Sequence, residues 1–113
     1  MHESGPTKKL IQHVLGEAAR RGASRVAAVK LKLGAGAGMS SESLVLHFEH
    51  AAEGTIAEGA RLDIEEVPIR YKCEECGAVV DSAEQLLFCP QCEEPKLKAV
   101  SGEEILVEAL ELV

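Results

Sequence analysis

Aromatic residues are nearly absent from this chain of 113 residues, which contains two Phe, one Tyr and no Trp. A hydrophobic core must therefore be built mainly from Leu, Val, Ile and Ala. The length is enough for one compact domain, or for one domain with a small module, and it is too short for two large cores.

Long apolar runs are also missing. No stretch reaches the roughly 20 apolar residues that a membrane-spanning helix needs. The first residues lack a basic stretch followed by an apolar one, so we expect neither a membrane interaction nor a signal peptide. The expected location is the cytoplasm, where thiols stay reduced, and four cysteines there are more consistent with metal ligands than with disulfides.

Basic residues are the minority among the charged residues, and their distribution is uneven. The net charge is −7, divided into +2 for residues 1–62 and −9 for residues 63–113. Because an acidic C-terminal half repels phosphate backbones, we expect no nucleic-acid partner. The acidic residues either keep a small protein soluble or favour a partner or cation that prefers a negative surface.

Two helices are predicted in the first half of the chain. The first covers residues 4–22, with Pro6 in its first turn and Gly22 at its end. Its apolar stripe is formed by Leu10, Ile11, Val14, Leu15 and Ala18. The second begins after a Ser40 or Ser41 cap and ends near Ala52, with Leu44, Phe48 and Ala51 on its buried face. His47 and His50 are spaced for a shared metal, although a solvated helix face is the simpler interpretation.

Three segments are predicted as strands. Residues 25–33 alternate apolar residues with Lys30 and Lys32, and the glycine-rich run at 34–38 must then form a loop. Residues 61–69 and 104–113 each change alternation phase midway, which predicts a bulge near Glu65 and Glu66 in the former. Because their phase breaks match, these two strands are expected to pair with each other, leaving residues 70–100 as an excursion between them.

The excursion contains the strongest motif in the sequence. Two C-x2-C pairs, Cys73/Cys76 and Cys89/Cys92, are separated by twelve residues. Each pair can direct two thiolates at one point, and two pairs complete the closed tetrahedron that structural Zn(II) prefers. Iron in the same sulfur cage and a redox dithiol are the alternatives. A zinc ion would fold a segment with too few apolar residues to fold alone.

The first three residues, Met1, His2 and Glu3, offer a second set of metal donors. A free amine, the His2 amide and the His2 imidazole would form two adjacent chelate rings, and Glu3 adds an amide or a carboxylate. Compact nitrogen donors of this kind favour square-planar Ni(II) or Cu(II).

The whole arrangement resembles the HypA/HybF family of hydrogenase nickel incorporation proteins, which are nickel metallochaperones. The resemblance covers nearly the full length and depends on the order of several segments: the initial MHE, AARRGASRVAAVKLKLG, GTIAEGARLDIEEVP, the two cysteine pairs and the closing GEEILVEALELV. It implies an α+β fold in which two helices pack on a small three-stranded mixed sheet, with an inserted zinc ribbon. The expected domains are a nickel-binding domain of residues 1–69 plus 101–113 and a zinc-ribbon domain of residues 70–100.

The resemblance also implies site residues, cargo and partners. The nickel ligand of the family corresponds to His2 and its acidic neighbour to Glu3, while the zinc ligands correspond to Cys73, Cys76, Cys89 and Cys92. Ni(II) would be a transferable cargo and Zn(II) a structural ion, in a non-enzymatic protein that is a monomer or weak homodimer. The implied partners are a nickel-inserting GTPase and a hydrogenase large-subunit precursor.

The sequence departs from the family pattern at three places. Ser4, Gly5 and Pro6 replace apolar residues after MHE, and small residues fill positions 35–38 of the loop after the first strand. Glu93 replaces the Gly that usually ends the second cysteine turn, which predicts backbone strain there. A different class of function, a zinc-ribbon interaction or regulatory module without cargo metal, remains an alternative. The sequence spacing shows no recognisable pair of nucleophile and base, so it does not favour an enzyme.

Overall fold

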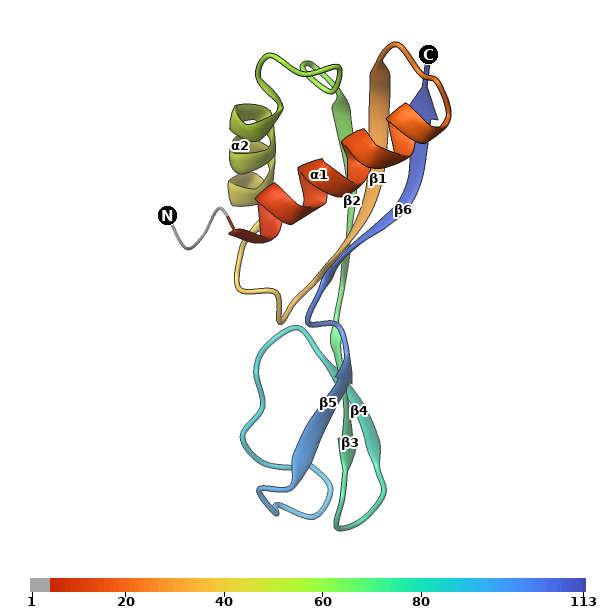
Figure 1. Cartoon of the computed structure of the whole chain (residues 1–113). Coiled ribbons are helices and arrows are strands. Elements are labelled where there is room, and N and C mark those ends of the chain that lie inside the picture. The colour runs from red at the N-terminus through yellow and green to blue at the C-terminus, as the bar shows by residue number, and fades with distance from the viewer. Residues whose placement is uncertain (1–4) are drawn as a thin grey trace.

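The computed structural model describes residues 5–113 and contains two helices and six strands in two small sheets, an α+β arrangement (Figure 1). The elements in chain order are α1 (Gly5–Arg20), β1 (Val26–Gly34), α2 (Ser41–Ala52), β2 (Arg61–Val67), β3 (Ile69–Cys73), β4 (Val79–Ser82), β5 (Leu97–Ser101) and β6 (Ile105–Leu112). The molecule is elongated, with extents of 53 × 27 × 17 Å. Neither helix in this part of the chain has the length and apolar character to cross a bilayer.

Both helices form where the sequence predicts them, although α1 ends at Arg20, two residues before the expected end. Ser40 caps α2, because its hydroxyl accepts a hydrogen bond from the Ser43 N–H at 3.1 Å. Gly22 follows α1 with a φ of 67°, a conformation that suits glycine at a helix end. Both helices pack on one face of the first sheet, and the core between them contains the predicted stripe of α1 together with Leu44 and Phe48.

The first sheet has the strand order β2-β1-β6, with β1 parallel to β2 and antiparallel to β6. The predicted pairing of residues 61–69 with 104–113 is therefore wrong, since β1 lies between them. Only the strands next to these segments in the chain pair directly: β3 pairs with β5 in the second sheet, whose strand order is β4-β3-β5. Central placement of β1 is physically reasonable, because its Val29 and Leu31 are fully buried whereas the residues of β2 are half-buried or exposed.

The two predicted irregularities have different outcomes. The register of β2 against β1 is continuous from Arg61 to Val67, so the bulge expected near Glu65 and Glu66 is absent from this strand. The phase change there arises because the chain leaves the first sheet at Pro68 and enters the second at Ile69. In β6 the phase change is a true register shift, in which Glu108 is the additional residue between Val107 and Ala109.

The loop after β1 forms hydrogen bonds with both connections between the two sheets, the one after β2 and the one before β6. The N–H groups of Ala35 and Gly36 donate to the carbonyls of Val67 and Gly102, each at 2.9 Å, and the Gly34 N–H donates to Glu104 at 3.0 Å. The small residues in this loop, a departure from the family pattern, therefore allow close approach of three backbone segments.

Gly102 is essential to that junction for a second reason. Its φ is 89°, and a Cβ at this position would lie well inside the van der Waals radii of the Pro68 carbonyl oxygen and the Ile69 Cα. Only glycine satisfies both requirements without displacing the connection between β2 and β3.

Candidate metal centre

The four cysteines come together at the far end of the second sheet. Cys73 is the last residue of β3, and the others lie in the turns that follow β3 and precede β5. Their Sγ atoms all lie within 4.8 Å of one another, with 3.6 Å between Cys73 and Cys92 and 3.7 Å between Cys76 and Cys89.

The two cysteine turns share one backbone conformation. In the first, the Gly77 N–H donates to the Cys73 carbonyl at 2.9 Å, and in the second the Glu93 N–H donates to the Cys89 carbonyl at 2.7 Å. Both donors have positive φ, 76° for Gly77 and 64° for Glu93. The strain predicted at Glu93 is thus present, and a left-handed conformation costs a non-glycine residue about 1–2 kcal/mol.

Backbone N–H groups point at the sulfur atoms of both turns. The N–H groups of Glu75 and Cys76 lie 3.4 and 3.5 Å from the Cys73 Sγ, and the N–H of Gln91 lies 3.4 Å from the Cys89 Sγ. Such donors stabilise a thiolate relative to a thiol. The turns are therefore built to hold negative charge on sulfur.

The thiols cannot all ionise in the absence of a cation. Hydrogen bonds from backbone N–H groups, that of Cys76 first, lower the pKa of Cys73 to about 7. The Glu94 N–H also favours the Cys92 thiolate, but burial and the three neighbouring thiols outweigh it and raise the pKa of Cys92 to about 12. One thiolate forms readily and the last forms only when a positive ion neutralises the cluster.

The donor set fits a tetrahedral zinc ion. Four ligands at a Zn–S distance of about 2.3 Å are separated by roughly 3.8 Å, close to the two short Sγ–Sγ distances given above. All four donors are thiolates, which leaves no position for water or substrate. Such an ion would supply structural cross-linking and no reaction chemistry.

The surroundings of the cluster show why the segment needs such a cross-link. Cys73, Cys89 and Tyr71 are buried, whereas three apolar side chains that could have formed a core are largely exposed: Val79 at 61%, Leu87 at 77% and Phe88 at 59%. The sequence did not single out Tyr71, whose hydroxyl accepts a hydrogen bond from the Leu86 N–H at 3.1 Å and thereby fixes the loop before Cys89. Tyr71 is the one tyrosine in the chain, and this was the sequence feature that could have indicated its structural role.

The predicted nickel residues His2 and Glu3 lie outside the described residues. Within residues 5–113, the four cysteines are the one group of three or more side chains arranged for a metal ion. His47 is half-buried, and the exposed His50 has its Nδ1 3.6 Å from a Glu53 carboxylate oxygen. The two are not part of a larger donor group in this range.

Comparison with known proteins gives a consistent result. Residues 1–112 match the family model described as hydrogenase/urease nickel incorporation, metallochaperone, hypA. A hydrogenase maturation factor HypA from Roseiflexus sp. (strain RS-1) is 41% identical over 98% of this chain and 91% of that protein. One from Chloroflexus aurantiacus (strain ATCC 29366 / DSM 635 / J-10-fl) is 40% identical over 98% of both chains.

Solved structures share the fold. The solution structure of the Ni metallochaperone HypA from Helicobacter pylori superposes with a TM-score of 0.73, over 98% of this chain and 97% of that one, at 23% sequence identity. The family match extends over nearly the whole sequence, and the relatives have similar lengths. The chain therefore belongs to the HypA family, the nickel metallochaperones of hydrogenase maturation.

Proposed function

We propose that this protein binds one Ni(II) ion at its N-terminus and delivers it during maturation of a [NiFe]-hydrogenase, while Zn(II) on the four cysteines maintains the ribbon. The nickel ligands are the terminal amine, the backbone nitrogen and imidazole of His2, and Glu3. The recipient is a hydrogenase large-subunit precursor in the cytoplasm, and a nickel-inserting GTPase assists transfer. Membership of the HypA family, over residues 1–112, is the observation that supports the proposal most strongly.

The separation of the two metal sites supports distinct roles. Resident zinc requires a closed donor set, and the four clustered sulfur atoms provide one. A cargo ion must be released, and nitrogen donors at a chain terminus can dissociate one at a time. The two donor sets also differ in softness, since thiolates select zinc whereas compact nitrogen donors suit Ni(II).

Calorimetric titration of untagged, zinc-loaded protein with Ni(II) tests the nickel site. We expect the His2→Ala variant and the N-acetylated protein to lose nickel binding while retaining zinc. His50→Ala is the matched control, because His50 is an exposed helix residue with a side chain 87% accessible. Uptake should also weaken in mild acid, because an unperturbed imidazole protonates near pH 6.5. Equal nickel affinity in the wild type and His2→Ala would reject the assignment.

Chelation tests the zinc site independently. Each Cys→Ser change should lower zinc affinity, measured by competition with a chromogenic chelator. NMR signals of residues 70–100 should collapse on zinc removal, whereas those of α1 and α2 should persist because their core is separate from the cysteine cluster. A ribbon that keeps dispersed signals in the metal-free protein would refute a structural role for zinc.

A ribbon that acts only as a protein-interaction module is the second candidate. The exposure of Leu87 and Phe88 beside Cys89 favours it, because exposed large apolar side chains often mark contact surfaces. The nickel titration separates the two candidates, since a module without cargo would show no stoichiometric nickel binding in the wild type.

A further inference from the structure

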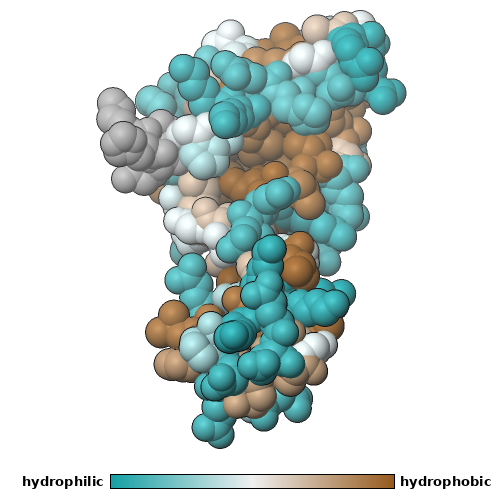
Figure 2. Space-filling view, turned by 60° about the horizontal axis from the view of Figure 1, so that its bottom comes forward, coloured by the Kyte–Doolittle hydropathy of each residue, from teal (hydrophilic) through white to brown (hydrophobic). Residues whose placement is uncertain are grey.

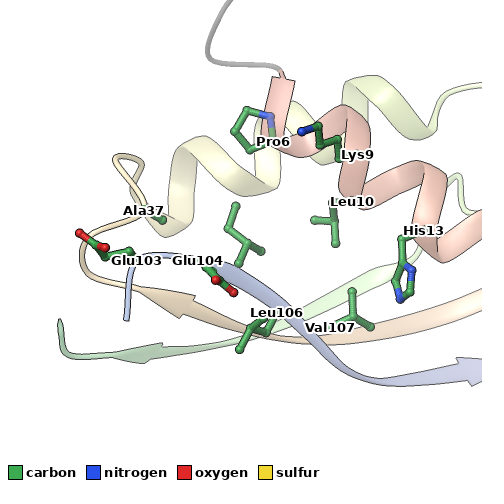
Figure 3. Close-up of a pocket in the computed structure, with 10 residues that line it drawn as sticks. Pro6, Lys9, Leu10, His13, Ala37, Glu103, Glu104, Leu106 and Val107 are labelled. Atoms are coloured by element: carbon green, nitrogen blue, oxygen red, sulfur yellow. The ribbon is translucent and has the colours of Figure 1, made fainter. Parts of the chain in front are cut away.

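A groove runs along the outer edge of β6, between that strand and α1. Its wider part has a volume of about 660 Å³ and is lined on the helix side by Pro6, Lys9, Leu10 and His13, and on the strand side by residues 103–107 (Figure 3). A second hollow of about 500 Å³ continues from His13 toward Arg21 and Leu112. Figure 2 shows apolar surface exposed beside α1 in the half of the molecule away from the ribbon.

The backbone of β6 is available for pairing on the side of this groove. The strand order β2-β1-β6 makes β6 an edge strand. Because Gly34 donates to the Glu104 carbonyl, the alternation of an antiparallel pair turns the N–H and C=O groups of Ile105 and Val107 away from β1. These two residues therefore present hydrogen-bonding groups to any extended chain in the groove.

The side chains define two different faces for such a chain. Ile105 and Val107 pack against the core beside the buried Leu10, so one face of an added strand would meet apolar atoms. On the other face, Leu106 is 51% exposed and lies between Glu104 and Glu108 in sequence. An occupant would need apolar residues on alternate positions and a different residue type between them.

The negative charge of this part of the chain indicates that the residues between the apolar positions of an occupant are basic. Residues 99–113 contain four glutamates, at positions 103, 104, 108 and 111, and no Lys or Arg. Glu108 already has Lys30 and Lys32 within 3.7 and 3.3 Å, whereas Glu103 and Glu104 lie at the end of the groove near Ala37 (Figure 3). A second copy pairing through β6 would place glutamates beside glutamates, which is unfavourable across strands.

We propose that the edge of β6 binds an extended segment of a partner protein in which apolar residues alternate with Lys or Arg. The segment adds a fourth strand to the sheet, with its apolar side chains under α1 and a basic side chain beside Glu104. The inference is independent of nickel binding, because it depends on residues 5–113 alone.

Three capped peptides provide the test, each titrated into ¹⁵N-labelled, zinc-loaded protein and followed by NMR. Acetyl-TKVKVKT-amide has the proposed pattern, acetyl-TEVEVET-amide reverses its charge, and acetyl-TKKKVVT-amide keeps the composition but loses the alternation. We expect the first to shift the signals of Leu10, Ile105 and Val107 and to slow amide exchange at Ile105 and Val107. Both other peptides should bind roughly tenfold more weakly, since they lose cross-strand pairing of charge or of apolar residues.

Two charge-reversal variants complete the experiment. Glu104→Lys should weaken binding of acetyl-TKVKVKT-amide roughly three- to tenfold, because an attractive cross-strand pair becomes repulsive. Glu65→Lys, on β2 at the opposite edge of the sheet, should leave the affinity unchanged. Equal binding of the three peptides, shifts confined to residues outside the groove, or a β6-mediated dimer that excludes the peptide would overturn the proposal.

Discussion

Substitution of Gly102 by alanine tests the junction between the two sheets. The change introduces two separate costs. A left-handed backbone costs an alanine about 1–2 kcal/mol. The new Cβ also collides with backbone atoms of Pro68 and Ile69, which have no side-chain freedom to relax, and overpacking of this kind costs about 1–3 kcal/mol. The expected loss of unfolding free energy is about 2–5 kcal/mol.

Gly38→Ala is the matched control for this variant. Gly38 has a φ of 82°, close to the 89° of Gly102, but a Cβ at Gly38 would meet no heavy atom within 4 Å. Its replacement should therefore cost only the backbone term of about 1–2 kcal/mol. The difference between the two variants isolates the collision at the junction.

Urea denaturation of the zinc-loaded proteins, followed by far-ultraviolet circular dichroism, measures both losses. Because α1 and α2 supply the helical signal, the assay reports whether damage at the junction spreads into the first sheet. We expect the Gly102→Ala protein to have a lower free energy of unfolding than the Gly38→Ala protein. Equal losses in the two variants would show that the close contact between Gly102 and Pro68 is unimportant for stability.

Two further predictions concern the first sheet and its core. Phe48→Ala should lower the free energy of unfolding by about 3–5 kcal/mol in urea denaturation, because Phe48 is 1% exposed, whereas Phe88→Ala should change it little, because Phe88 is 59% exposed; comparable losses would contradict the assigned core. The hydrogen bond from Arg61 lowers the pKa of Asp63, so this carboxylate stabilises the folded protein above its unfolded pKa and loses that effect as pH falls through the lower folded value. Carbon-detected NMR titration should show the low pKa in the wild type and an ordinary one in Arg61→Gln; an unchanged pKa in the variant would refute the assigned cause.

Local features of this fold were predictable because short-range chemistry determines them. The Ser40 cap, the stripe of α1 and the glycine after it depend on residues within one or two helical turns. The cysteine cluster was equally accessible, because the spacing within each pair sets the turn and the metal requires two turns. Even the positive φ of Glu93 followed from comparison with the glycine expected there.

Strand order was not accessible in the same way. The alternation phases of residues 61–69 and 104–113 are compatible with direct pairing, but in the structure β1 pairs with a strand at each of its edges and separates them. A phase break also has two physical causes that look alike in sequence, a bulge as at Glu108 or a transfer to another sheet as at Pro68. The groove beside β6 depends on where α1 crosses the sheet, which no local pattern specifies.

The closeness of Gly102 to Pro68 and Ile69 has a consequence for the architecture of the chain. The polypeptide enters and leaves the ribbon at nearly the same point, so this module is a closed side loop of the main fold. A shortened chain that joins Pro68 to Glu103 through a glycine would bridge a gap of only a few atoms. Excision at this point would yield a ribbon-free protein in which the proposed nickel binding could be studied without the cysteine thiolates.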